Sequence, residues 1–451
     1  MQAEPRKFSR IGVIGMGYVG LTLTAAMANK GYEVHGVEIQ PAILESLSKG
    51  QPHIFEPGVA EAFDALLGER IFVAAELPPE PVDAVIISVS TPVDPVMHVP
   101  YLKNLALAAE QIAERCSPET LVVVRSTVPV GTSRAVVLPP LADAWGTVHL
   151  VMAPERTIQG TALRELVELP QVVGGLDLAS LDLGLALFGA FAHQVVPVSS
   201  LEAAEMVKLT NNCHTDVIYA FGNEVARMTE QLGLDPLEII RAANLDYPRP
   251  DVAKPGYVGG GCLSKDPYIM LAGAERAGHV PALIGAARTL NEDLPVHVAE
   301  RVVALMSEVG ARTLTVLGWA YKGWPPTDDM RGTPIETMMP VFLAAGIEVR
   351  GHDPLVAREV IESYGAEPVD LPRGFRDTDA VLVITDHPQY RELGPAELLE
   401  DSRVRLVFDS WRILDGDAIA SGGVRYAGLG FEPVPAAQSA DGQPADLAVA
   451  R

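Results

Sequence analysis

The sequence has little cysteine and no long apolar run. Its 451 residues include three cysteines, which lie far apart at Cys116, Cys213 and Cys262. An odd number of widely spaced cysteines does not form a disulfide framework or a cysteine-ligated metal cluster, so each must be judged singly. No stretch approaches the roughly 20 consecutive apolar residues of a membrane span, and the first residues lack an apolar signal core. We therefore expect a cytoplasmic protein without a membrane partner.

Positive charge is also scarce. The chain carries 34 lysines and arginines against 58 aspartates and glutamates, which gives a formal net charge of -24 at pH 7. At this charge the protein and a phosphate polymer repel each other at long range, so nucleic acid is not expected as a partner. A phosphorylated small molecule would need a local positive pocket. A chain of this length exceeds what one hydrophobic core usually organises, so two or three domains are expected.

The apolar runs indicate two α/β regions separated by a helical one. Residues 10–38 are typical of a strand, a glycine-rich turn, an amphipathic helix and a second strand. Further apolar runs extend a parallel sheet to about Pro197. From Leu201 to Gly233 and from Pro267 to Val309 the sequence is alanine-rich and helical, with little strand signal.

The last third of the chain repeats the pattern of the first. The segment GYEVHGVE at 31–38 recurs as GIEVRGHD at 346–353. We therefore expect an α/β fold with two Rossmann-like doubly wound domains joined by a helical spine. The expected segments are an amino-terminal Rossmann-like domain at 1–200, a central helical region at 201–309, a carboxy-terminal Rossmann-like domain at 310–431 and a disordered Pro/Ala/Gly-rich tail at 432–451.

A glycine-rich turn predicts a dinucleotide site. Gly15, Gly17 and Gly20 form the pattern G-x-G-x-x-G between the first strand and the first helix. Without side chains there, the backbone can approach a pyrophosphate at a helix N-terminus. Glu38 ends the second strand, where a carboxylate accepts ribose hydroxyls and repels a 2′-phosphate, which favours NAD over NADP. The alternatives are glycines that serve packing alone and a solvated strand end.

The segment PGYVGGGCLSKDP at 255–267 combines glycines with a cysteine, a lysine and an aspartate, and it is the strongest candidate for a catalytic loop. Its proline and glycines predict a loop whose backbone comes close to another group, rather than a helix or a regular strand. Within it Cys262 is followed by Lys265 and Asp266. A neighbouring cation and open access suit a nucleophilic thiol. Cys116 and Cys213 lack this context and are expected to be small core residues.

Polar residues at three other places suggest a ligand site. Lys208 and Asn212 are four residues apart in a helical segment, so they share a face and could stabilise an oxygen anion. Residues 126–127 and 155–157 end two apolar strands, and parallel sheets bind ligands at the carboxyl ends of their strands. Solvated helix and strand ends are the alternative interpretation in each case.

Taken in order, the motifs resemble those of the UDP-glucose/GDP-mannose dehydrogenase family. They span about residues 8–430 and comprise G-x-G-Y-V-G, S-T-P at 90–92, STVPVGT, PER, E-x-V-K-L-x-x-N, GGGCLSKD and K-x-x-x-P-x-D-D-x-R. The resemblance implies two Rossmann-like domains joined by a long helix that builds a homodimer. It also implies NAD as cofactor, a UDP-sugar as substrate, and a four-electron oxidation without metal.

The resemblance implies a functional role for each residue that matches a family motif. It implies that Cys262 is the nucleophile, and it implies catalytic roles for Lys208, Asn212, Asp266, Glu155 and Thr127. Cofactor contacts are implied for Gly15, Gly17, Tyr18, Val19, Gly20, Glu38, Ser90, Thr91, Thr127 and, from the far domain, Arg331. Substrate contacts are implied for Glu155, Arg156, Thr157, Lys208, Tyr257, Gly259, Lys322 and, in the partner subunit's site, Arg249.

The chemistry independently requires a nucleophile. An aldehyde has no carbinol hydrogen for a second hydride transfer until a nucleophile adds to it. Addition of the Cys262 thiolate gives a thiohemiacetal, whose oxidation leaves a thioester that water hydrolyses. Lys208 and Asn212 would stabilise the successive oxyanions, an effect of roughly 3 to 4 kcal/mol per donor in other enzymes.

Departures from the family pattern bear on the sugar. Gln159 stands where UDP-glucose enzymes usually have a glutamate, and this resembles the branch acting on UDP-N-acetylhexosamines. Gly261 and Trp411 also replace the usual residues. We expect UDP-N-acetylmannosamine or UDP-N-acetylglucosamine as substrate, with UDP-glucose as the alternative and GDP-mannose disfavoured. The rivals are a two-electron hydroxyacid dehydrogenase, which would not need Cys262, and a non-catalytic NAD-binding protein.

Overall fold

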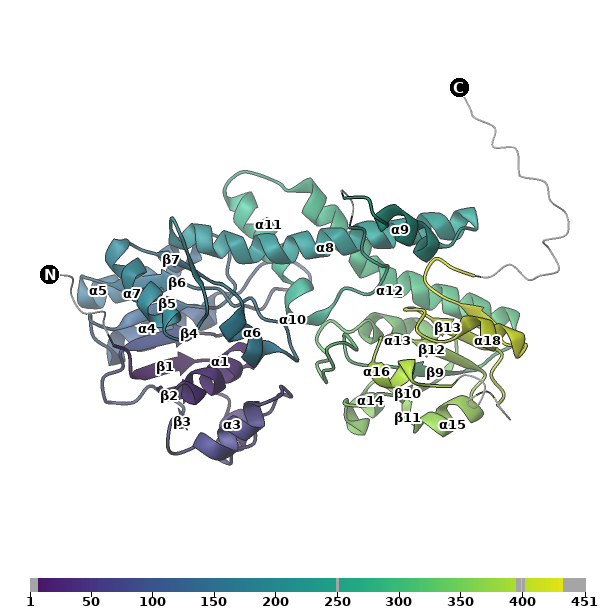
Figure 1. Ribbon diagram of the computed structural model, residues 1–451, viewed down its shortest axis with the longest axis horizontal. Helices are drawn as coiled ribbons and strands as arrows, with labels where there is room; N and C mark the ends of the chain where they lie inside the picture. Colours follow the sequence, from purple (N-terminus) through teal and green to yellow (C-terminus); the bar gives the residue numbers. More distant parts are fainter. Residues whose placement is uncertain (1–6, 249–250, 395–398, 400–401, 433–451) are drawn as a thin grey trace, which may run out of the picture. The chain divides into compact units, whose positions relative to one another are not determined.

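The computed structural model describes residues 7–248, 251–394, 399 and 402–432 and contains two compact units (Figure 1). The first unit comprises Met1–Val217, Val258–Thr289 and Ala320–Gly332. The second comprises Ile218–Tyr257, Leu290–Trp319 and Thr333–Arg451. Two long helices, α8 (Leu201–Leu232) and α12 (Ala282–Glu308), begin in the first unit and end in the second. Both segments that the sequence predicts as a helical spine are therefore helical.

The first unit is built on an eight-stranded sheet with the order β3-β2-β1-β4-β5-β6-β7-β8. All neighbouring strands are parallel except β6 and β7, which are antiparallel. The strands are β1 (Arg10–Ile14), β2 (Glu33–Val37), β3 (Ile71–Ala74), β4 (Ala84–Ile87), β5 (Leu121–Val124), β6 (His149–Met152), β7 (Gln171–Gly175) and β8 (Val195–Val198).

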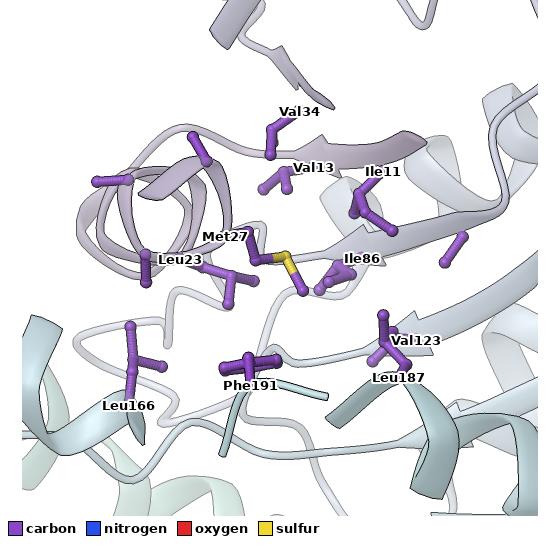
Figure 2. Packing of buried hydrophobic residues seen from close by; sticks show 14 of the residues in the cluster. Ile11, Val13, Leu23, Met27, Val34, Ile86, Val123, Leu166, Leu187 and Phe191 are labelled. Carbon is purple, nitrogen blue, oxygen red and sulfur yellow. The ribbon is translucent and has the colours of Figure 1, made fainter. Parts of the chain in front are cut away.

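Alternate residues of these strands enter two different hydrophobic clusters, so both faces of the sheet are covered. Figure 2 shows one cluster, in which Val13 of β1 and Ile86 of β4 meet Met27. Ile14 and Ile87, the next residues along the same strands, belong to the other cluster. Burial on both faces explains why these strands read as continuous apolar runs, with each large side chain contributing roughly 1.5 to 3 kcal/mol.

The helices of the first unit supply the covering layers. They are α1 (Tyr18–Asn29), α2 (Pro41–Ser48), α3 (Val59–Leu66), α4 (Lys103–Arg115), the π-helix η1 (Ser133–Val137), α5 (Leu138–Trp145), α6 (Ala162–Glu168), α7 (Leu178–Gly189), α10 (Gly260–Leu263) and α11 (Asp266–Arg276). None of the described helices of the chain is long and apolar enough to span a membrane.

The second unit repeats the arrangement of the first six strands with the order β11-β10-β9-β12-β13-β14, all parallel. The strands are β9 (Thr313–Leu317), β10 (Glu348–His352), β11 (Glu367–Pro368), β12 (Ala380–Val383), β13 (Leu406–Asp409) and β14 (Arg425–Ala427). The helices are α9 (Pro236–Asn244), α13 (Ile335–Ala344), α14 (Arg358–Ser363), α15 (Leu371–Arg376), α16 (Pro388–Arg391) and α18 (Gly416–Ser421). The predicted α/β fold with two Rossmann-like sheets is confirmed.

One local prediction is wrong. The glycine-rich segment expected to be only a loop contains the one-turn helix α10, which carries Cys262. Packing explains the difference, because a Cβ on Gly259 would lie 2.0 Å from the carbonyl oxygen of Gly332 and one on Gly260 would lie 2.7 Å from the Tyr321 ring. The glycines thus allow close backbone packing that overrides their poor helix propensity. Of the expected tail at 432–451, all but the first residue lies outside the described residues.

Candidate active site

The glycine-rich turn after β1 contains two glycines that the fold itself requires. Gly15 has a φ of +93°, and a Cβ there would come within 3.0 Å of the Ser88 backbone. A Cβ on Gly20 would lie 1.9 Å from the carbonyl oxygen of Gly15. At Gly17, in contrast, no atom of the described chain lies within 4 Å of a Cβ position. Packing thus accounts for Gly15 and Gly20, whereas the open space at Gly17 fits a pyrophosphate at the N-terminus of α1.

Five more predicted cofactor residues lie at the same edge of the first sheet. Tyr18 and Val19 begin α1. Ser90 and Thr91 follow β4, and Thr127 follows β5, so all come after the carboxyl ends of adjacent parallel strands. Because β1 and β4 are neighbours although they are not consecutive, this edge contains the topological switch point where such sheets bind ligands.

Glu38 is fixed at this edge by backbone donors. It follows β2 and is 6% exposed. One carboxylate oxygen accepts a hydrogen bond from the N–H of Met16 at 3.3 Å, and the other accepts one from the N–H of Gln40 at 2.9 Å. Each oxygen retains an acceptor lone pair. The residue therefore fits recognition of the adenosine ribose hydroxyls of NAD.

Glu155, which follows β6, is an anion fixed by four donors. One oxygen accepts hydrogen bonds from Nε and Nη2 of Arg125 at 3.0 and 2.6 Å. The other accepts the backbone N–H groups of Arg156 and Thr157 at 2.7 and 2.8 Å. Burial raises the pKa of Glu155, but the Arg125 guanidinium and the backbone donors outweigh burial and lower it. Glu155 thus stays ionised and fixes the start of the loop formed by residues 155–161, named the 155–161 loop.

A second set of bonds fixes the far end of this loop. The segment Ala320–Gly332 packs in the first unit, although the residues on both sides of it belong to the second. From it Lys322 donates to the carbonyl oxygen of Gln159 at 2.8 Å. The side-chain amide of Gln159 donates to Asp329 at 2.8 Å, and Asp329 forms an ion pair with Arg331 at 2.6 Å. The predicted residues Lys322 and Arg331 therefore lie in one network with this loop.

Three buried polar atoms of the 155–161 loop make no hydrogen bond to the described residues. Nε of Arg156, Oγ1 of Thr157 and Oε1 of Gln159 are buried without a hydrogen-bond partner among the described residues. Arg156 is nevertheless held in place, because its Nη1 donates to the carbonyl oxygen of Pro170 at 3.2 Å. Buried polar atoms are nearly always paired, so such atoms indicate where a ligand binds. A guanidinium, a hydroxyl and an amide oxygen together suit a ligand rich in hydroxyl and amide groups.

The three cysteines differ in exposure. Cys262 on α10 is exposed, Cys116 is half-buried and Cys213 is buried. Burial raises the pKa of Cys116 to about 11 and that of Cys213 to about 12. Because the thiolate is the reactive form, the two shielded cysteines are poor nucleophiles. The contrast supports Cys262 as the reactive cysteine.

Beside Cys262 lies a buried carboxylate held from two sides. Asp266 accepts hydrogen bonds from Lys265 at 2.9 Å and from the side-chain amide of Asn212 at 2.5 Å. Burial lowers the pKa of Lys265, but the negative charges of the Asp266 carboxylate and the Cys262 thiolate outweigh burial and raise the pKa. Lys208, one turn before Asn212 on α8, is 7% exposed. Two predicted catalytic residues, Asn212 and Asp266, are thus in direct contact.

Among the described residues of the second unit, Tyr257 is the one predicted substrate residue. Its hydroxyl lies 2.8 Å from the hydroxyl of Ser410, and the neighbouring residue Gly256 exchanges two backbone hydrogen bonds with the Asn223 side chain. A Cβ on Gly256 would lie 2.3 Å from the ring of Trp411. The unusual Trp411 therefore packs directly on the backbone of this loop. Gly259 lies in the first unit, and the predicted Arg249 lies outside the described residues.

Comparison with known proteins matches three consecutive family models to this chain. They describe the UDP-glucose/GDP-mannose dehydrogenase family: its NAD binding domain at residues 9–192, its central domain at 202–293 and its UDP binding domain at 315–416. The chain belongs to the UDP-glucose/GDP-mannose dehydrogenase family. It is therefore an NAD-dependent nucleotide-sugar dehydrogenase, as the resemblance implied.

Relatives of this dehydrogenase match it over almost its whole length. It is 28% identical to the UDP-N-acetyl-D-mannosamine dehydrogenase of Methanococcus vannielii, over 95% of this chain and 98% of the relative. It is 30% identical to the enzyme of the same name from Pyrococcus horikoshii, over 93% and 99%. The solved structure of the Pyrococcus horikoshii enzyme superimposes with a TM-score of 0.84 at 29% identity, covering 93% of this chain and 99% of that one. A UDP-glucose dehydrogenase from Pyrobaculum islandicum gives 0.80 at 27% identity, covering 94% and 98%.

Several residues that position the site of this dehydrogenase are absent from the sequence-based prediction. Arg125 holds Glu155, and its only sequence signal is a charge that ends an apolar strand. Arg288 of α12 forms a buried ion pair with Asp216 of α8 at 2.6 Å and donates to the carbonyl oxygen of Leu263 at 2.9 Å. Leu263 directly follows Cys262 in the chain. This buried pair therefore anchors α10 to the two long helices.

Proposed function

We propose that this dehydrogenase oxidises the C6 hydroxyl of UDP-N-acetylmannosamine or UDP-N-acetylglucosamine to a carboxylate. The observation that carries the choice of sugar is Gln159, which combines a neutral amide fixed by Asp329 with a buried oxygen that has no partner among the described residues. An acetamido N–H is a suitable donor to this oxygen. The names of the similar enzymes from Methanococcus vannielii and Pyrococcus horikoshii support the same assignment. UDP-glucose is the alternative, because a UDP-glucose dehydrogenase superimposes nearly as well.

The proposed reaction balances as one alcohol, two NAD⁺ and one water giving one carboxylate, two NADH and three protons. When bound, NAD⁺ accepts one hydride in each of the two oxidations. The residues proposed to hold NAD⁺ are Gly15, Gly17, Tyr18, Val19, Gly20, Glu38, Ser90, Thr91, Thr127 and Arg331. The support for this is the open position at Gly17 and the fixed carboxylate of Glu38.

Cys262 is the proposed nucleophile. Its thiolate sulfur adds to the C6 aldehyde, a C–S bond forms, and the carbonyl oxygen becomes the oxyanion of a thiohemiacetal. Loss of hydride from C6 leaves a thioester, and attack by water breaks the C–S bond and returns the thiol. Lys208 and Asn212 are proposed to stabilise the oxyanions. This role is supported by the exposure of Cys262, in contrast to the half-buried Cys116 and the buried Cys213.

The proton transfers are assigned to groups beside Cys262. Asp266 is the proposed acceptor of protons from the alcohol and from water, and Lys265 and Asn212 fix its carboxylate. Glu155 and Thr127 are proposed to orient the hydrolytic water. Because Glu155 already accepts four hydrogen bonds and is held ionised, its contribution is a fixed negative charge rather than proton uptake.

The proposed substrate contacts are Glu155, Arg156, Thr157, Lys208, Tyr257, Gly259 and Lys322, with Arg249 entering the partner subunit's site. The proposed domain division remains 1–200, 201–309 and 310–431, the last binding the nucleotide.

A homodimer is part of the proposal. On α8 the side chains of Phe221, Met228 and Leu232 are 53%, 52% and 65% exposed, and their spacing places them on one helical face. An apolar stripe of this kind favours pairing with a second copy. A cytoplasmic location is also proposed, since three free cysteines without a disulfide are typical of a reducing compartment.

The test is a panel of UDP-N-acetylmannosamine, UDP-N-acetylglucosamine, UDP-glucose and GDP-mannose, with NADH measured per nucleotide sugar consumed. We expect two NADH per UDP-N-acetylhexosamine and the highest kcat/KM for one of the two acetamido sugars. One NADH per sugar would indicate a two-electron dehydrogenase instead. A higher kcat/KM with UDP-glucose would refute the sugar assignment while leaving the family activity intact.

A further inference from the structure

The carboxylate of Glu56 joins the dinucleotide turn to the end of the 155–161 loop. One of its oxygens accepts hydrogen bonds from the Tyr18 hydroxyl and from the backbone N–H of Gly160, both at 2.6 Å. The other accepts the backbone N–H of Ala162 at 2.8 Å. Glu56 is 5% exposed. A single buried side chain thus bonds to two segments that lie more than 130 residues apart in sequence.

The Tyr18 end of this connection belongs to the proposed cofactor site. Tyr18 is the first residue of α1 and directly follows Gly17, where space is open. The backbone N–H groups at this helix end are those that would face a pyrophosphate. The bond from the Tyr18 hydroxyl to Glu56 therefore restrains the first residue of this helix end.

The Gly160 end belongs to the proposed substrate loop. Gly160 has a φ of +94°, and a Cβ there would lie 2.5 Å from Cβ of Pro325, so the backbone is enclosed on that side. The preceding residue, Gln159, is held through its carbonyl oxygen by Lys322 and through its side chain by Asp329. Glu56 supplies the bonds on the side of the loop that reaches Tyr18. The position of the unpaired Gln159 oxygen therefore depends on where Glu56 holds the next residue.

We propose that Glu56 is a positioning residue that couples the two ligands, so that a bound nucleotide sugar strengthens NADH binding and the reverse. The bonded path runs from Tyr18 through the Glu56 carboxylate to Gly160, so a ligand that shifts the position of either end also shifts the position of the other. Thermodynamic linkage requires the two effects to be equal in size. The proposal rests on the family activity and not on the identity of the sugar.

The test compares the Kd of NADH with and without saturating UDP-N-acetylmannosamine, by NADH fluorescence. NADH cannot accept a hydride, so the sugar is not consumed. We expect the sugar to lower the Kd by about five-fold or more in the unmodified protein. Glu56→Gln keeps the size of the side chain but weakens the three hydrogen bonds that the carboxylate accepts. In this variant the coupling factor, which is the ratio of the NADH Kd without sugar to the Kd with sugar, should fall below about two-fold.

Two further variants separate coupling from folding. Tyr18→Phe removes one bond and leaves the carboxylate in place, so it should give an intermediate factor even if Glu56→Gln folds poorly. Glu61→Gln makes the same chemical change on an exposed carboxylate of α3 and should keep the unmodified factor. A purely structural role for Glu56 would lower the melting temperature and leave the factor unchanged.

Three results would overturn the proposal: no effect of the sugar on the unmodified protein, an unchanged factor in Glu56→Gln and Tyr18→Phe, or an equal loss in Glu61→Gln. Direct titration of the nucleotide sugar alone separates this from failure of the proposed function. If UDP-N-acetylmannosamine does not bind, the sugar assignment fails, and the same titrations with UDP-glucose then decide the role of Glu56.

Discussion

Gly261 lies directly against the guanidinium of Arg331. A Cβ at residue 261 would lie 2.8 Å from Cζ and 2.9 Å from Nη1 of Arg331, which is closer than a Cβ approaches non-bonded atoms. Arg331 in turn is fixed by its ion pair with Asp329. The absence of a side chain before Cys262 therefore has a physical cause, because it makes room for a cation beside the proposed nucleophile.

The first prediction concerns this contact. Gly261→Ala should displace the Arg331 guanidinium and lower kcat by about ten-fold or more, because small misplacements in an active site have large kinetic effects. The measurement is steady-state NADH formation at saturating substrate. Gly285→Ala is the matched control, since within the described chain no atom lies within 4 Å of a Cβ at that helical position. Equal kcat in Gly261→Ala and the unmodified protein would contradict the proposed arrangement.

The second prediction concerns the nucleophile. Cys262→Ser should lower uronate formation by about 10³-fold or more, because a serine hydroxyl is not ionised at neutral pH and adds poorly to the aldehyde. Cys213→Ser and Cys116→Ser are the controls and should retain most of the activity. Product is measured by mass spectrometry together with NADH. Normal uronate formation by Cys262→Ser would show that the chain does not use a thioester.

The fold was largely predictable because both sheets are buried on two faces. Their strands read as apolar runs, and the motif between β1 and α1 sets the register of the first βαβ unit. Helix α10 was not predictable, because glycines favour a loop by propensity, whereas here they allow the backbone to pack closely against Tyr321 and Gly332.

The contacts within the candidate site were predictable only in part. Cys262, Asp266 and Asn212 stand out as unusual residues in apolar or glycine-rich contexts. Arg125 and Glu56 do not, since each acts on a segment that is distant in sequence and neither has a local pattern of its own. Such partners can be identified only in the folded structure, where segments that are distant in sequence lie side by side.

The third prediction concerns the choice between NAD and NADP. Glu38→Ser removes the carboxylate that would repel a 2′-phosphate, so kcat/KM with NADP should rise by about ten-fold or more relative to NAD. Both cofactors are compared with the same nucleotide sugar. Glu45→Ser, on the exposed surface of α2, serves as control. If the NADP to NAD ratio does not change in Glu38→Ser, another residue selects the cofactor.

The last prediction concerns the buried pair of Arg125 and Glu155, whose side chains are 0% and 8% exposed. Glu155→Gln leaves a buried guanidinium without its counter-ion and should cost about 3 to 5 kcal/mol of stability at pH 7. Glu202→Gln breaks the exposed pair with Arg134 and should cost at most about 1 kcal/mol. Unfolding in urea, followed by circular dichroism, measures both.

The pH dependence of the free energy of unfolding tests whether Glu155 is ionised in the folded protein. The pKa of Glu155 is lowered from its usual 4.5 in the folded protein, so folding stabilises the ionised form. That stabilisation is fully present above about pH 4.5 and is lost as the pH falls through the lower folded pKa. The stability difference between the unmodified protein and Glu155→Gln should therefore be constant from pH 7 to 5 and shrink below pH 4.5. A difference that grows on acidification would mean that Glu155 is protonated in the folded state, and it could then serve as an acid in thioester hydrolysis.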